Sequence, residues 1–162
     1  MTKVKDEFIK NKNNIGYVDS DFTKEFGNDE ITSRSVLKAQ TLQRDMTDSD
    51  ILREFKIEEC TLGDVLETLK SATPDMKDGY SNIFYIKGHP SRVVDVDWCA
   101  FDGGWDVYAW RRDYGSWNEG ERVFSPATSG PESSSALGSE TLALENAIKI
   151  CKENGLKVTK EY

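Results

Sequence analysis

Alternation of hydrophobic and polar positions divides the chain into a mainly helical part, residues 1–79, and an antiparallel β part, residues 80–126. The polar, lysine-rich stretch 3–14 predicts a frayed helix. A short helix follows, capped by Asp19 or Ser20 and ended by Gly27.

Residues 30–46 are ambiguous. Val36, Leu37, Ala39 and Leu42 can share a helical face, but Leu37, Ala39 and Thr41 also alternate as in a strand. We favour a helix here.

Two further helices have clear start signals. Thr47-x-x-Asp50 resembles a capping box with Asp in place of the usual Glu. Thr61 precedes an apolar stripe at helical spacing, which consists of Leu62, Val65, Leu66 and Leu69. The stripe predicts a helix with one face in the core.

Strands are predicted after Asp78-Gly79. Residues 80–87 contain a run of β-favouring side chains, and Gly88-His89-Pro90 then forms a turn in which His89 is expected to face water. A later strand over residues 121–125 is expected to stop at Pro126.

The hairpin over residues 93–112 is the clearest local pattern. Its strands alternate, and Asp102-Gly103-Gly104 supplies a tight turn. A two-residue loop places even positions of the first strand on the same face as odd positions of the second. The predicted core face therefore contains Val94, Val96, Trp98, Ala100, Trp105, Val107 and Ala109.

The opposite face and the next turn hold the candidate binding residues. They combine carboxylates with aromatic and basic side chains: Asp95, Asp97, Asp106, Tyr108, Trp110, Arg112, Tyr114 and Trp117. Acids beside tyrosine and tryptophan suit a basic peptide, through ion pairs and cation–π contacts.

The last part of the chain completes the predicted fold. Small polar residues over 127–139 predict a flexible loop, and residues 140–162 predict a helix followed by a short strand. We expect a single α+β domain over residues 1–162. Its antiparallel sheet of about four strands would pack with the N-terminal helices and the C-terminal helix.

Composition narrows the function classes. The net charge of −8 disfavours general binding to nucleic-acid phosphates. No apolar run is long enough to cross a membrane and the first residues include acids, so we expect a cytoplasmic protein without a membrane partner.

The sequence lacks the usual motifs of cofactor-binding and metal-binding sites. The three cysteines, Cys60, Cys99 and Cys151, are widely spaced and indicate buried thiols. A catalytic Cys–His pair would need His89, the only histidine. We predict no cofactor and no metal, although Asp95 and Asp97 with Asp106 resemble an oxygen-rich cation site.

Three functions follow from these patterns. Since no complete catalytic set is present, we favour a non-enzymatic binding or adaptor protein that recognises a protein or peptide; the acids of the candidate face suit a basic one. One alternative is an acidic inhibitor or nucleic-acid mimic. The other is a hydrolase that uses Asp95, Asp97 and Asp106.

Overall fold

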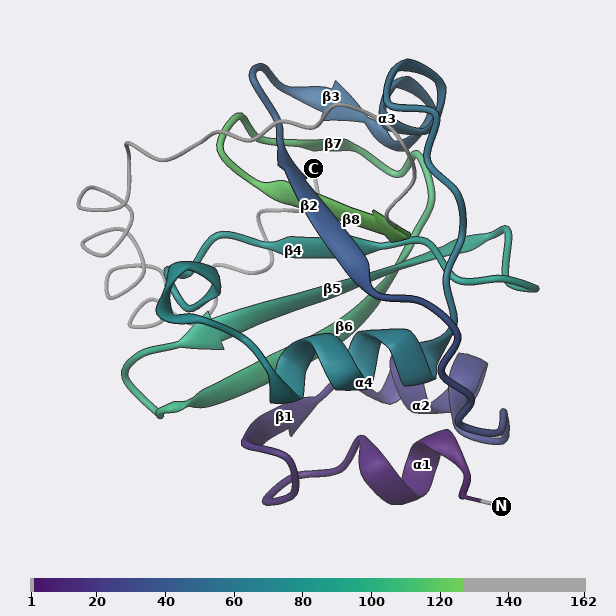
Figure 1. Ribbon diagram of the computed structural model, residues 1–162, viewed down its shortest axis with the longest axis vertical. Coiled ribbons are helices and arrows are strands. Elements are labelled where there is room, and N and C mark those ends of the chain that lie inside the picture. Colours follow the sequence, from purple (N-terminus) through teal and green to yellow (C-terminus); the bar gives the residue numbers. More distant parts are fainter. Residues whose placement is uncertain (1, 127–162) are drawn as a thin grey trace.

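The computed structural model describes residues 2–126 of the chain, and the predicted loop over 127–139 and the helix and strand over 140–162 lie outside this part (Figure 1). The helices are α1 (Val4–Glu7), α2 (Ser20–Phe26), α3 (Asp48–Glu54), α4 (Leu62–Lys70) and a 3₁₀ turn, η1 (Pro74–Met76). The strands are β1 (Ile15–Val18), β2 (Leu37–Thr41), β3 (Met46–Thr47), β4 (Asn82–Phe84), β5 (Arg92–Cys99), β6 (Gly104–Arg111), β7 (Ser116–Trp117) and β8 (Arg122–Pro126).

The main sheet confirms the α+β class but corrects its form. It has six strands in the order β1-β6-β5-β4-β8-β2, and it is mixed because β1 runs parallel to β6 and β4 parallel to β8. The expectation of about four antiparallel strands is therefore wrong. Both edge strands, β1 and β2, come from the part of the sequence that was predicted to be mainly helical.

The β5–β6 hairpin has the predicted register. Val96 faces Val107 and Trp98 faces Trp105, so even positions of β5 share the core face with odd positions of β6. The loop itself is longer than predicted, running from Ala100 to Gly103. Ala100 is consequently exposed in the turn and does not belong to the core face.

Two adjacent glycines in the hairpin have different roles. Gly103 adopts a positive φ of 70°, which glycine accepts without strain. A Cβ on Gly104 would lie 3.1 Å from the backbone nitrogen of Gly16, so this position lets β1 approach β6 closely.

The predicted helix starts are confirmed. The Asp19 side chain accepts from the backbone N–H of Asp21 and caps α2. Thr47 with Asp50, and Thr61 with Asp64, form complete capping boxes at α3 and α4. The frayed helix over 3–14 is reduced to the four residues of α1.

The helix favoured over residues 30–46 is wrong. The segment contains no helix: residues 31–36 have no regular secondary structure and lead into β2, which pairs with β8. The carboxylate of Asp64 accepts from the backbone N–H groups of Arg34 and Ser35 and fixes this segment across the start of α4. Asp64 lies far from this segment in the sequence, so the local pattern of apolar residues does not reveal these hydrogen bonds.

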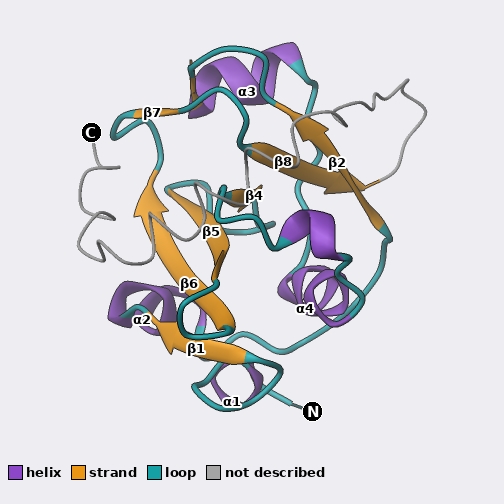
Figure 2. Ribbon diagram, turned by 90° about the vertical axis from the view of Figure 1, so that its left-hand side faces the viewer, coloured by secondary structure: helices purple, strands orange, loops and turns teal. Residues whose placement is uncertain are grey.

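The sheet separates two hydrophobic cores. One face packs with α1, α2 and α4, and α4 lies across β5 and β6 in Figure 1. The other face packs with α3 and the β3–β7 ribbon around Ile83, Tyr85 and Trp117. Figure 2 shows α1 and α3 at opposite ends of the molecule. Both faces of the sheet therefore contribute side chains to a hydrophobic core.

Among residues 2–126, no helix combines the length and apolar character that a membrane span requires.

Candidate functional site

Carboxylates and aromatic rings meet on the face of β5 and β6 that points away from α4. Register places Asp95 opposite Tyr108 and Asp97 opposite Asp106, with Trp110 further along β6. Tyr17 of β1 joins them through its contact with Tyr108. We call this set the acidic–aromatic face: Tyr17, Asp95, Asp97, Asp106, Tyr108 and Trp110.

The side chain of Asp95 is the least satisfied polar group of this face. Asp95 is 1% exposed, and its Oδ2 accepts from the indole Nε1 of Trp110 at 2.9 Å. Its Oδ1 is buried, and no residue among 2–126 donates a hydrogen bond to it. A buried carboxyl oxygen without a donor is energetically costly, but at 1% exposure Asp95 is closed to the side chain of a partner.

Three aromatic rings form a row beside the acids. Tyr108 stacks on Trp110 with ring centroids 5.5 Å apart and planes 22° apart. Tyr17 lies 5.6 Å from Tyr108 on the other side and is 47% exposed. The electron-rich faces of such rings attract cations.

A β-bulge brings Tyr17 to this face. Ile15 pairs with Trp105 but Tyr17 pairs with Asp106, so the register shifts by one residue at Gly16. Without the bulge, Ile15 and Tyr17 would point to the same side; with it, Ile15 enters the core and Tyr17 joins the acids. Tyr17 was not predicted as a site residue. The run Ile15-Gly16-Tyr17-Val18, which lies between asparagines and Asp19, is the sequence pattern that indicates a strand here.

The pKa values of the tyrosine hydroxyls reflect the electrostatic potential at this face. Burial, together with Asp97, Asp106 and Asp95, raises the pKa of Tyr108 well above its usual value. Burial, then Asp19 and Asp106, also raise the pKa of Tyr17. Both shifts have the sign that a negative potential produces, and such a potential attracts cationic ligands.

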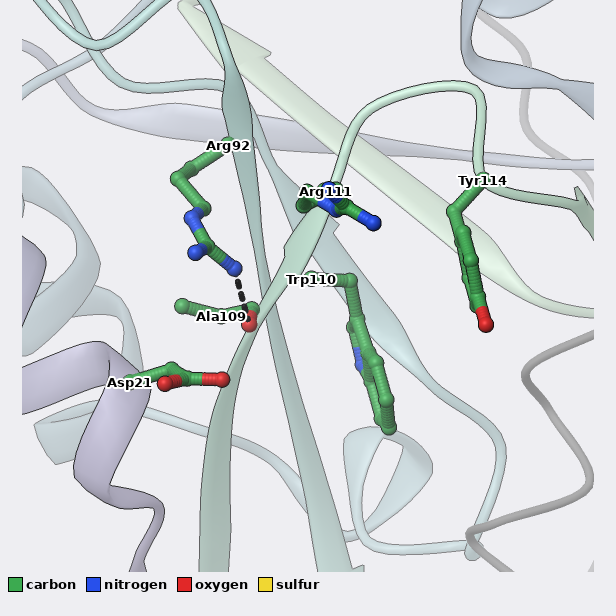
Figure 3. Close-up of a pocket in the computed structure, with 6 residues that line it drawn as sticks. All are labelled: Asp21, Arg92, Ala109, Trp110, Arg111 and Tyr114. Carbon is green, nitrogen blue, oxygen red and sulfur yellow. Dashed lines mark hydrogen bonds between the residues drawn. The ribbon is translucent and has the colours of Figure 1, made fainter.

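An open cavity of about 350 Å³ adjoins this face at Trp110. In Figure 3, Asp21 and Arg92 lie on one side of β6, and Trp110 and Tyr114 lie on the other. Arg92 donates from Nη1 to the backbone oxygen of Ala109 at 3.3 Å. The guanidinium of Arg111 lies 5.6 Å from the Tyr114 ring centroid. The cavity therefore reaches around the edge of β6.

Trp117, predicted as a binding residue, lies in the second core. It is 2% exposed, and its Nε1 donates to Asp48 at 2.8 Å. Asp48 also accepts from the Tyr85 hydroxyl at 2.5 Å and from the backbone N–H of Asp113 at 2.7 Å. Burial raises the pKa of Asp48, against the effect of these three donors. Trp117 therefore fastens the β6–β7 turn to α3.

Arg112 and Tyr114 have different surroundings. Arg112 is largely buried, donating to the backbone oxygens of Arg92 and His89 and pairing with Glu59 at 3.3 Å, so its contacts hold the structure together. Tyr114 is 53% exposed and lines the cavity.

His89 does not simply face water as predicted. Its Nδ1 lies 2.7 Å from Glu25 and its Nε2 lies 2.7 Å from Asp29, and its ring packs on Phe26. Burial lowers the pKa of His89, but the two carboxylates outweigh burial and raise it. This histidine links the turn before β5 to the end of α2.

Two features of residues 2–126 concern metal binding and cysteine chemistry. Within 2–126, no three histidine, cysteine, aspartate or glutamate side chains are arranged to hold a metal ion. Cys60 is buried, and burial raises the pKa of its thiol far above the usual value, which disfavours a nucleophilic thiolate.

Comparison of the chain with protein-family models, with curated proteins and with solved structures found no match. The function must therefore be argued from the site itself.

Proposed function

We propose that the protein is a non-enzymatic binding protein whose acidic–aromatic face recognises a basic segment of a partner protein. The single observation that carries the proposal is the stacked pair of Tyr108 and Trp110, which is partly exposed beside the partly exposed carboxylate of Asp106. An ammonium or guanidinium group of a partner can lie on these rings and pair with this carboxylate.

The aromatic row supports the same ligand class. A lysine or arginine side chain can lay its apolar stem on the stacked rings of Tyr108 and Trp110 while its charge approaches Asp106. The overall charge of −8 would speed the encounter with a basic partner at low ionic strength.

Binding of a short capped peptide of alternating lysine and threonine tests the proposal by isothermal titration calorimetry. We expect saturable binding that weakens with added salt, and no binding of the matched peptide in which glutamate replaces lysine. Asp106→Asn should weaken the binding of the lysine peptide about tenfold, equivalent to about 1.4 kcal/mol.

Asp75→Asn is the matched control. Asp75 is exposed on η1, beside Met76 of the first core, so this variant removes the same charge at a site away from the acidic–aromatic face. If Asp106→Asn and Asp75→Asn weaken peptide binding equally, the binding depends on the net charge alone, and this result would contradict the proposal. Absence of lysine-peptide binding would contradict it outright.

A further inference from the structure

The guanidinium of Arg111, at the end of β6, has no carboxylate partner in the described part of the chain. Four other arginines pair with carboxylates there: Arg44, Arg53, Arg112 and Arg122. Among residues 2–126, no carboxylate lies within ion-pair distance of Arg111, and no oxygen accepts a hydrogen bond from its side chain. The side chain is exposed, so its N–H donors are accessible to a ligand.

The ring of Tyr114 positions this guanidinium. The Cζ of Arg111 lies over the Tyr114 ring, 5.6 Å from its centroid, and the backbone N–H of Tyr114 donates to the Arg111 oxygen at 3.4 Å. A guanidinium that lies on an aromatic ring keeps its N–H groups at its edge, where they can bind a carboxylate through two parallel hydrogen bonds. The arrangement therefore favours an anionic group beside Arg111.

The cavity of Figure 3 provides the space for such a group. Trp110, Arg111 and Tyr114 line it together with Asp21 and Arg92. Arg92 is the register partner of Arg111 across the β5–β6 ladder, and two like charges in this position destabilise a sheet unless an anion neutralises them. The charged side chains of the lining have a net charge of +1, which the single charge of a carboxylate balances better than a phosphate does.

Trp110 belongs both to this cavity and to the acidic–aromatic face. A strand rises by about 3.3 Å per residue, so β6 covers about 10 Å between Tyr108 and Arg111. An extended peptide covers the same distance with about three residues. A basic segment that binds at Tyr108 and Trp110 therefore has another of its residues within reach of Arg111.

We infer that the partner segment contains a carboxylate next to its basic side chains and that Arg111 binds this carboxylate at the cavity; the inference rests on the proposed function. The ammonium group of the segment lies on the rings of Tyr108 and Trp110 and pairs with Asp106. The carboxylate pairs with the guanidinium of Arg111, one or two residues further along the segment. This carboxylate is either the C-terminus of the partner or an acidic side chain.

Three versions of the lysine–threonine peptide, all with the same N-terminal cap, test the inference by isothermal titration calorimetry. One ends in a free carboxylate, one in an amide, and one in an added glutamate followed by an amide. We expect a carboxylate to tighten binding about tenfold relative to the plain amide. A gain with the free acid alone assigns the carboxylate to a C-terminus, and a gain with the glutamate peptide assigns it to an acidic side chain. The net charge of −8 repels an added carboxylate, so any gain comes from a local contact.

Arg111→Gln and Arg34→Gln are the matched variants for this measurement. Arg34 is also exposed and has no ion pair within residues 2–126, but it lines a different groove, beside α4. We expect Arg111→Gln to bind the acidic and amidated peptides within about twofold of each other, and Arg34→Gln to keep the tenfold preference. Arg111→Lys keeps the charge but not the paired N–H groups, so its preference should be intermediate. The melting temperature of each variant establishes that it is folded.

The outcomes separate the inference from the proposed function. Equal binding of all three peptides to the natural chain overturns the carboxylate site and leaves the proposed function standing. A preference that Arg111→Gln and Arg34→Gln reduce equally also overturns the site, because the net charge then explains the preference. If none of the peptides binds, both the inference and the proposed function fail.

Discussion

At the scale of single residues, the chain is constrained most where two backbone segments approach each other closely. Gly63 sits in the first turn of α4, where the extended segment before β2 crosses the helix. A Cβ built on Gly63 would lie 2.0 Å from the backbone oxygen of Thr32 and 2.8 Å from the backbone nitrogen of Ser33. Both neighbours are backbone atoms, so they cannot rotate away as the end of a side chain could. The same crossing is held by Asp64 and by a hydrogen bond from the Thr61 hydroxyl to the Thr32 oxygen.

Gly63→Ala should therefore lower the free energy of unfolding by about 3 kcal/mol, because the crossing segment must move away from α4. Gly16→Ala is the control, since the nearest atoms to a Cβ there are 3.8 Å away and it should change stability by less than about 1 kcal/mol. Urea denaturation of both variants measures the difference. Equal effects would mean that the crossing adapts easily.

At the scale of elements, local signals predicted some parts and missed others for identifiable reasons. The hairpin parity was predictable because side-chain alternation has a fixed period, and the capping boxes because their bonds span three residues. Strand β2 was not, because its partner β8 lies far along the chain and residues 30–46 also fit a helix. The bulge at Gly16 needs the register against β6, which no local pattern contains.

The residues of the candidate site also include some whose position was predictable from local signals and some whose position was not. Asp95, Asp97, Tyr108 and Trp110 were grouped correctly on one face because they lie on one hairpin. Trp117 was predicted as a binding residue in the turn after the hairpin, but its indole reaches Asp48, 69 positions away in sequence, and is buried. Side-chain hydrogen bonds over such distances decide burial, and sequence spacing does not reveal them.

Another element-scale contact, that of His89 with Glu25 and Asp29, predicts a pH dependence of stability. The carboxylates raise the folded-state pKa of His89 above 6.5, so its contribution is fully present below pH 6.5 and is lost as the pH rises through the folded-state pKa. The stability advantage of the natural chain over His89→Gln should therefore shrink as the pH is raised from below 6.5 through the folded-state pKa. Urea denaturation across this range measures it. A constant difference between the two proteins would show that the histidine pair does not contribute through its charge.

At the scale of the whole molecule, two hydrophobic cores cover most of the sheet, and the binding that we propose takes place on the strip that they leave. One face and the β4–β8 side of the other are filled by the two cores. The β5–β6 side of the second face carries the acids and the aromatic row, with an open cavity at its end. Asp106, Tyr108 and Trp110 are partly exposed on this strip, as the proposed binding surface requires.

The central claim is that a basic segment binds at the acidic–aromatic face, and nuclear magnetic resonance during titration with the lysine–threonine peptide tests it most directly. The indole N–H of Trp110 donates to Asp95, so its resonance should shift most among the four tryptophans, together with the backbone amides of β6 near Tyr108. The indole N–H of Trp117, bonded to Asp48 in the core, should stay unchanged and serves as the internal reference. Saturable shifts centred on Trp110 are the predicted result. Shifts centred elsewhere, for example around the exposed Val36 beside α4, would contradict the account.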